Sequence, residues 1–202
     1  EIAAPGPDGY CIVADPEDAR LYVTGQSASG VVAGVGRLMR EMQYAPGLLT
    51  IPDLDIRETP RMPNRGIYLW ARKFYFQEPD RVDRYIEELA LWGCNGICFW
   101  FEMGMFDSFD TAGKGPNLVN QHDNRLSPRE WLKMYRRFYA TARRMGMKTG
   151  LLMVANDAYR TSPEALRIEP IIGCPNCYLC PSKPGAVDMM LDWQEQVFKA
   201  LA

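Results

Sequence analysis

The chain has 202 residues, of which 47% are apolar and 24% are charged, and its formal net charge is −2. Such a composition is typical of a globular protein, and the lack of a basic cluster argues against a nucleic-acid partner. No apolar run approaches the ~20 residues that a membrane-spanning helix needs, so we expect no membrane span. The length allows one or two domains.

Residues 1–60 have the pattern of a small α+β domain. Two short strands, a helix and two edge strands are predicted in that order over 10–14, 21–24, 31–42, 48–51 and 54–56. The proline-rich stretch 59–64 is typical of a linker. Gly34 and Gly36 match the start of a dinucleotide-binding fingerprint, but Met39 stands where its third glycine belongs. We therefore expect these glycines to let the helix approach its sheet closely.

After the linker the pattern becomes a short apolar strand, a loop and an amphipathic helix, three times in succession. The strands are predicted over 66–70, 96–101 and 149–155. Their helices begin near Pro79, at a capping box formed by Ser127 and Glu130, and at Ser182. Apolar strands that alternate with helices indicate a parallel sheet covered on both faces, so the predicted fold class is α/β.

Polar and aromatic side chains gather at the predicted strand ends, where α/β folds place their chemistry. The candidate substrate-binding residues are Arg65 and Trp70 around the first strand, Trp100 and Glu102 after the second, and Asn156 and Asp157 after the third. Aromatic rings that stack on apolar C–H faces, beside charged groups that bind hydroxyls, suit a sugar.

Each candidate also has a structural interpretation. Glu102 and Asp157 can serve as loop caps or ion-pair partners, the tryptophans can be core residues, and Asn156-Asp157 is a good turn dipeptide. For Arg65 the alternative is an ion pair with a carboxylate such as Asp83 or Glu102.

Six cysteines raise the question of a metal. Cys174, Cys177 and Cys180 form a C-x-x-C-x-x-C tract, but Pro184 stands where an iron–sulfur site needs its fourth cysteine. A structural zinc site needs four ligands, and the sole histidine, His122, lies far away in the sequence. We expect no metal and no cofactor, and either free thiols or one local disulfide.

The stretches Ser27–Met39 and Ile51–Gly66 resemble the small N-terminal domain, and its junction with the barrel, of family 20 β-N-acetylhexosaminidases. A similar domain precedes the barrel of family 67 α-glucuronidases and family 84 hexosaminidases. The resemblance continues through 74–76 and 83–95. It implies a small α+β domain over residues 1–60 and, over 61–202, the first three βα units of a truncated TIM (β/α)8-type barrel.

The implied activity is that of a glycoside hydrolase acting on terminal sugars of glycans, in a secreted or periplasmic location, with a cytoplasmic one left open. By this resemblance Arg65 matches the arginine that binds sugar hydroxyls. The third strand departs from family 20, because Asn156–Tyr159 replaces its Pro-Gly-His loop. The principal acid/base of these families lies on the fourth strand, so we expect these 202 residues to be inactive on their own.

Two other functions remain open at this point. One is a non-catalytic carbohydrate-binding module, which would keep Arg65 and the tryptophans. The other is a metal-binding or redox protein, which the cysteine tract alone supports.

Overall fold

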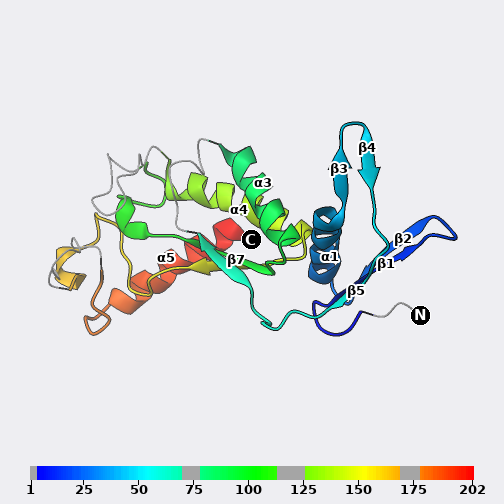
Figure 1. Ribbon diagram of the computed structural model, residues 1–202. Helices are drawn as coiled ribbons and strands as arrows, with labels where there is room; N and C mark the ends of the chain where they lie inside the picture. Colours follow the sequence, from blue (N-terminus) through cyan, green and yellow to red (C-terminus); the bar gives the residue numbers. More distant parts are fainter. Residues whose placement is uncertain (1–3, 70–77, 113–125, 169–177) are drawn as a thin grey trace. The chain divides into compact units, whose positions relative to one another are not determined.

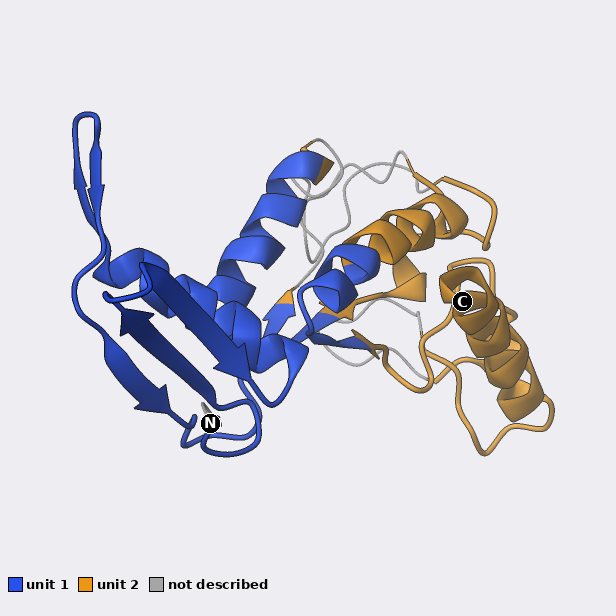
Figure 2. Cartoon of the chain, turned by 90° about the vertical axis from the view of Figure 1, so that its right-hand side faces the viewer, with its two compact units in different colours: residues 1–68, 80–98, 139–150 blue, residues 69–79, 99–138, 151–202 orange. Residues whose placement is uncertain are grey.

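The structure is a computed structural model, and it describes residues 4–69, 78–112, 126–168 and 178–202 (Figure 1). It divides into two compact units (Figure 2). Unit 1 comprises residues 1–68, 80–98 and 139–150, and unit 2 comprises residues 69–79, 99–138 and 151–202. In the described part of the chain, no helix combines the length and apolarity needed to cross a lipid bilayer.

An antiparallel sheet forms the beginning of unit 1. Its central strand β1 (Tyr10–Asp15) pairs with β2 (Arg20–Gly25) on one side and with β5 (Asp55–Glu58) on the other. Helix α1 (Ala28–Glu41) packs on this sheet. The apolar core between them consists of Tyr10, Ile12, Ala33, Leu38 and Leu54. The α+β pattern expected for this region is therefore present.

A hairpin of β3 (Gln43–Ala45) and β4 (Leu48–Thr50) follows α1 and stands away from that sheet (Figure 1). The sequence predicted β4 but not β3. The turn between them contains Gly47 at φ +74°, a conformation that L side chains rarely adopt. The Pro46-Gly47 pair was the signal that could have revealed the hairpin.

Helix α1 comes very close to the end of α3 (Pro79–Leu91). A Cβ atom added to Gly36 would lie 1.8 Å from the Leu91 carbonyl oxygen, and one added to Gly34 would lie 2.9 Å from the Val23 side chain. No side chain fits at either distance. The expectation that these glycines serve close packing is confirmed. Gly34 approaches the sheet of α1 as predicted, whereas the neighbour of Gly36 is the end of α3.

The second sheet consists of β6 (Gly66–Leu69), β7 (Gly96–Trp100) and β8 (Lys148–Leu152), in that order. At their amino ends, the Asn95 N–H donates to Arg65 O (3.2 Å) and the Lys148 N–H donates to Asn95 O (2.9 Å). At the carboxyl ends, the Phe101 N–H donates to Leu152 O (3.0 Å). Like ends lie together, so the strands are parallel, as their alternation with helices predicted.

The strands alternate with α3, α4 (Pro128–Arg144) and α5 (Ala186–Leu201). The capping box of α4 is confirmed, because the Ser127 N–H donates to the Glu130 carboxylate (2.7 Å) and the Glu130 N–H donates to the Ser127 hydroxyl (3.4 Å). The expected cap of α5 is wrong. This helix begins after Gly185, which adopts φ +81°, and not at Ser182.

Aromatic rings fill the core of unit 2. The ring centroid of Phe99 lies 4.8 Å from that of Tyr135 and 5.6 Å from that of Phe138. Phe106 meets the edge of Trp131 at 5.4 Å. Because side chains alternate along a strand, the burial of Phe99 against α4 directs Trp100 to the other face of β7.

We predict that Gly36→Ala lowers the free energy of unfolding by about 1–3 kcal/mol, because the added methyl group must push α1 away from Leu91. Alanine has a higher helix propensity than glycine, which by itself would stabilise α1. A lower free energy of unfolding must therefore come from the steric clash. Val35→Ala, on an exposed neighbour in the same helix, is the control, and we expect a change within ~0.5 kcal/mol. Urea unfolding measures both, and equal effects would contradict the close approach.

Candidate functional site

Two buried carboxyl groups lie in unit 2 beyond the ends of β7 and β8. Glu102 comes two residues after β7 and is 8% exposed, while Asp157 follows β8 and is fully buried. Carboxylates are seldom buried to this extent unless other groups compensate their charge. The groups that compensate these two carboxyls therefore define the candidate site.

Asp157 accepts three backbone hydrogen bonds. The donors are the N–H groups of Met103, of Gly104 (3.2 Å) and of Ala158 (3.0 Å). Met103 and Gly104 begin the short 3-10 helix η1 (Met103–Met105) that follows β7. Asp157 therefore caps η1 and ties the segment after β8 to the segment after β7, which is the loop-cap interpretation of this residue.

Burial raises the pKa of Asp157 to about 7, although the three N–H donors act in the opposite direction. The negative charge of Glu102 raises it further. Burial also raises the pKa of Glu102, and the neighbouring Trp100 side chain partly opposes this shift. The two carboxyls therefore act on each other electrostatically and compete for ionisation.

Glu102 thus interacts electrostatically with Asp157, and the Trp100 side chain lies beside Glu102. Trp100 is half-buried, and its carbonyl oxygen accepts a hydrogen bond from the Tyr135 hydroxyl (2.6 Å), which holds the end of β7 against α4. A half-buried indole beside a protonatable carboxyl can offer a ring face and a hydrogen-bonding group to the same small molecule.

Asn156 precedes Asp157 in the sequence, but its side chain is directed to the backbone of Leu179. Its side-chain amide donates to Leu179 O (3.0 Å), and its carbonyl oxygen accepts from the Leu179 N–H (2.9 Å). These bonds hold the turn against the segment that begins at Tyr178. They also use one hydrogen-bond donor of the Asn156 amide, so fewer of its hydrogen-bonding positions remain for a ligand. Strand β8 ends at Leu152, earlier than the predicted residue 155, so Asn156 and Asp157 belong to this turn and not to the strand itself.

Tyr159 belongs to the same cluster, and the sequence reasoning missed it. It is buried, its ring meets the edge of Trp193 at 4.9 Å, and in the described part of the chain its hydroxyl has no hydrogen-bond partner. Burial, together with the negative charges of Asp157 and Asp110, raises the pKa of Tyr159. An aromatic residue two positions after Asp157 was the available signal.

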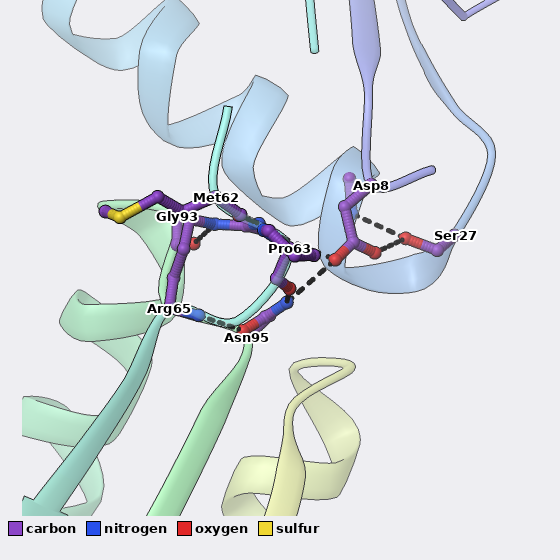
Figure 3. A network of polar contacts seen from close by, with 8 residues as sticks. Asp8, Ser27, Met62, Pro63, Arg65, Gly93 and Asn95 are labelled. Carbon is purple, nitrogen blue, oxygen red and sulfur yellow. Dashed lines mark hydrogen bonds and ion pairs between the residues drawn. The ribbon is translucent and has the colours of Figure 1, made fainter. Parts of the chain in front are cut away.

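Arg65 belongs to unit 1, where it precedes β6 (Figure 3). Its guanidinium donates to Gly93 O (2.7 Å), to Met62 O (2.6 Å) and to the Asp8 carboxylate (3.2 Å). Its side chain is only 15% exposed. These contacts favour the structural alternative for Arg65, with Asp8 as the partner in place of Asp83 or Glu102.

Asp8 and Asn95 complete the network around Arg65. Asp8 accepts hydrogen bonds from the Ser27 hydroxyl (2.6 Å) and from the Asn95 side-chain amide (2.9 Å). These two bonds lower the pKa of Asp8, and each has a larger effect on it than Arg65 does. The Asn95 side-chain oxygen accepts from the backbone N–H of Arg65 (2.8 Å), and its amide also donates to Pro63 O (2.7 Å). The network therefore joins the start of the chain, the cap of α1, the linker and the start of the parallel sheet.

Several predicted residues lie outside the described residues, namely Trp70, His122, Cys174 and Cys177. Cys180 is described, and it is a free thiol. Across residues 4–69, 78–112, 126–168 and 178–202, no group of three or more histidine, cysteine, aspartate or glutamate side chains is placed to hold a metal ion.

No protein-family model matches the chain, and no curated protein matches it in sequence. Solved structures do match. A mutant Streptomyces plicatus β-hexosaminidase in complex with its product GlcNAc has a TM-score of 0.69 and 19% identity, over 100% of this chain and 44% of that enzyme. A β-N-acetylhexosaminidase from Bacteroides fragilis has a TM-score of 0.68 and 15% identity, over 99% of this chain and 42% of that enzyme. A family 20 β-N-acetylhexosaminidase from Streptomyces coelicolor has a TM-score of 0.68 and 17% identity, over 98% of this chain and 44% of that enzyme.

At identities of 15–19%, these matches show a shared fold. The chain spans less than half the length of each of these enzymes. They support the family 20 part of the resemblance, and they lend no support to the family 67 or family 84 parts.

We predict that Arg65→Ala lowers the free energy of unfolding by at least about 2 kcal/mol, because Asp8 and two carbonyl groups lose a charged donor. Arg57→Ala is the matched control. Arg57 forms an exposed ion pair with Asp55, so we expect a loss below ~1 kcal/mol. Denaturant unfolding of both variants tests this. Unchanged stability of Arg65→Ala, combined with lost sugar binding, would restore the sugar-binding role.

Asp157 makes the stability depend on pH in a predictable direction. With a pKa near 7 in the folded protein, against an ordinary value of 3.8, the folded state keeps a proton that the unfolded chain has released. Stability contributed by this proton is present at about pH 4 and is lost as the pH rises toward about 7, with a slope of at most ~1.4 kcal/mol per pH unit.

Between about pH 5 and about pH 7, the free energy of unfolding of the wild type should decrease. We expect that of Asp157→Asn to decrease less over the same range. Asp53→Asn, which changes an exposed carboxyl of unit 1, is the control and should keep the wild-type slope. Equal slopes for all three proteins would show that Asp157 is ionised throughout this range.

Proposed function

We propose that this chain is the N-terminal part of a family 20-type glycoside hydrolase. In this proposal residues 1–60 form the small α+β domain, and residues 61–202 form the first three βα units of a (β/α)8 barrel. The observation that carries the proposal is the fold match to β-N-acetylhexosaminidases over 98–100% of this chain. The parallel order β6-β7-β8 supports the barrel part of it.

The proposed sugar site lies at the carboxyl ends of β7 and β8. The Trp100 ring would stack on the apolar face of a terminal N-acetylhexosamine, and Glu102 would bind its hydroxyls. Asp157 acts as a positioning residue, because it holds η1 in place beside Glu102. Trp70 and Asn156 remain proposed members of this site. A secreted or periplasmic location, which the resemblance implies, belongs to the same proposal.

Hydrolysis needs carboxyl groups on both sides of the glycosidic bond, or one carboxyl with help from the substrate's own acetamido group. The raised pKa of Glu102 suits a group that donates a hydrogen bond or a proton. The principal acid/base, however, is expected on a fourth strand. The 202 residues by themselves should therefore bind the sugar without cleaving it.

A carbohydrate-binding module without catalysis is the second candidate. It is favoured by the geometry of Asp157, whose oxygens are committed to three backbone N–H groups and are poorly available for chemistry. Turnover distinguishes the two functions. If the whole protein binds N-acetylglucosamine but does not cleave aryl N-acetyl-β-glucosaminides, the module is correct and the hydrolase is wrong.

Calorimetric titration with N-acetylglucosamine tests the site itself. We expect Glu102→Gln to weaken binding about tenfold or more, because hydrogen bonds to a charged group contribute about 1.5–3 kcal/mol. Glu164→Gln, an exposed carboxyl of unit 2, should leave the affinity unchanged. Equal affinities of the wild type and Glu102→Gln would remove Glu102 from the proposed site.

A further inference from the structure

A cavity of about 310 Å³ lies entirely within unit 1. It is bounded by β1, α1, the end of β5, the linker that follows and the end of α3, and its lining includes Tyr10, Arg40, Glu58, Arg61, Arg65 and Trp92. Glu102 and Asp157 belong to unit 2, so the proposed sugar site does not use this cavity.

The only acidic side chain in this lining is already neutralised. One oxygen of the Glu58 carboxylate accepts from the Tyr10 hydroxyl, and the other accepts from the Arg37 guanidinium at 3.2 Å. The charge of Arg65 is matched in the same way by Asp8, at 3.2 Å. Neither Glu58 nor Asp8 is therefore available to balance a further cation.

Arg40 and Arg61 have no carboxylate partner among the described residues, although each lines the cavity. Two guanidinium groups at one cavity, without a matching acid, create a positive potential there. Guanidinium groups present a planar fork of donors that matches the geometry of carboxylate, sulfate and phosphate oxygens.

Arg40 is also held in position before any ligand arrives. Its Nη1 donates to Leu91 O (3.1 Å), and its guanidinium carbon lies 4.4 Å from the centroid of the Trp92 ring. A side chain that is ordered in advance loses less entropy when it binds a ligand. Trp92 is 65% exposed, an unusual degree for a tryptophan, and it offers ring surface to an uncharged part of a ligand.

We propose that this cavity binds a small molecule that carries one oxyanion, which is a phosphate, a sulfate or a carboxylate group. Arg40 and Arg61 bind the oxyanion, and the Trp92 ring contacts the uncharged body of the molecule. The volume is at the lower end of the ~300–1,000 Å³ that ligand pockets span, which suits a molecule of about one sugar ring. The site is distinct from the proposed hydrolase site and does not depend on it.

The test compares probes that differ only in their charged group. The protein is titrated with N-acetylglucosamine 6-phosphate, N-acetylglucosamine 6-sulfate and N-acetylglucosaminuronic acid, with uncharged N-acetylglucosamine as the reference. We expect at least one charged probe to bind about tenfold tighter than the reference, and to bind more weakly at high ionic strength. The probe that binds best identifies the oxyanion. The Glu102→Gln variant should keep this binding, which separates the two sites.

Variants assign the binding to the cavity. Arg61→Gln alters an exposed linker residue, and Arg40→Met keeps an apolar stem beside Trp92, so thermal unfolding should show both to be folded. Each should weaken the best charged probe about tenfold or more. Arg84→Gln removes an exposed arginine of unit 1 that does not line the cavity, and it should have no effect. The proposal is overturned if no charged probe binds tighter than N-acetylglucosamine, or if Arg84→Gln weakens binding as much as Arg61→Gln does.

Discussion

The hydrogen bonds around Arg65 hold unit 1 together, and the arrangement of its elements depends on them. A guanidinium that is largely removed from water needs its donors satisfied and its charge matched. Here that requirement brings Asp8, Met62 and Gly93 to one point, although they lie far apart in the sequence. Asn95 adds the start of β7 to the same point, because it binds the backbone of Arg65 and the carboxylate of Asp8.

The backbone groups of Arg65 and Asn95 also align the strands of the parallel sheet. The Arg65 carbonyl accepts from the Asn95 N–H, and the Asn95 carbonyl accepts from the Lys148 N–H, so the amino ends of β6, β7 and β8 are aligned in turn. The close approach of Gly36 to Leu91 fixes α1 against the end of α3 in the same unit. It also brings Arg40 to the Leu91 carbonyl, which is how α1 comes to line the cavity.

At the other end of the sheet the governing constraint is the cost of burying carboxyl groups. Asp157 meets this cost with backbone donors, and the geometry of η1 follows from them. Glu102 has the Trp100 side chain beside it, and burial keeps its pKa raised. The same chemical group thus serves as a structural cap at one position, and at the other it is the proposed sugar-binding group.

The sequence by itself determined the features that depend on neighbours along the chain. Periodicity identified the α/β alternation, the Ser127–Glu130 pattern located the start of α4, and the small side chains of Gly34 and Gly36 indicated close packing. These features were predictable because side chains three or four positions apart meet on a helix whatever the rest of the chain does.

Only the tertiary structure decided the roles of Arg65, Asp157 and Tyr159. The partner of Arg65 is 57 positions away, and the backbone donor of Asp157 in Met103 is 54 positions away. No local pattern contains such a pair, because hydrogen bonds and burial are decided by where distant segments meet. For the same reason the Arg40–Trp92 wall of the cavity has no signature in the sequence, since it exists only where the end of α1 lies against the end of α3.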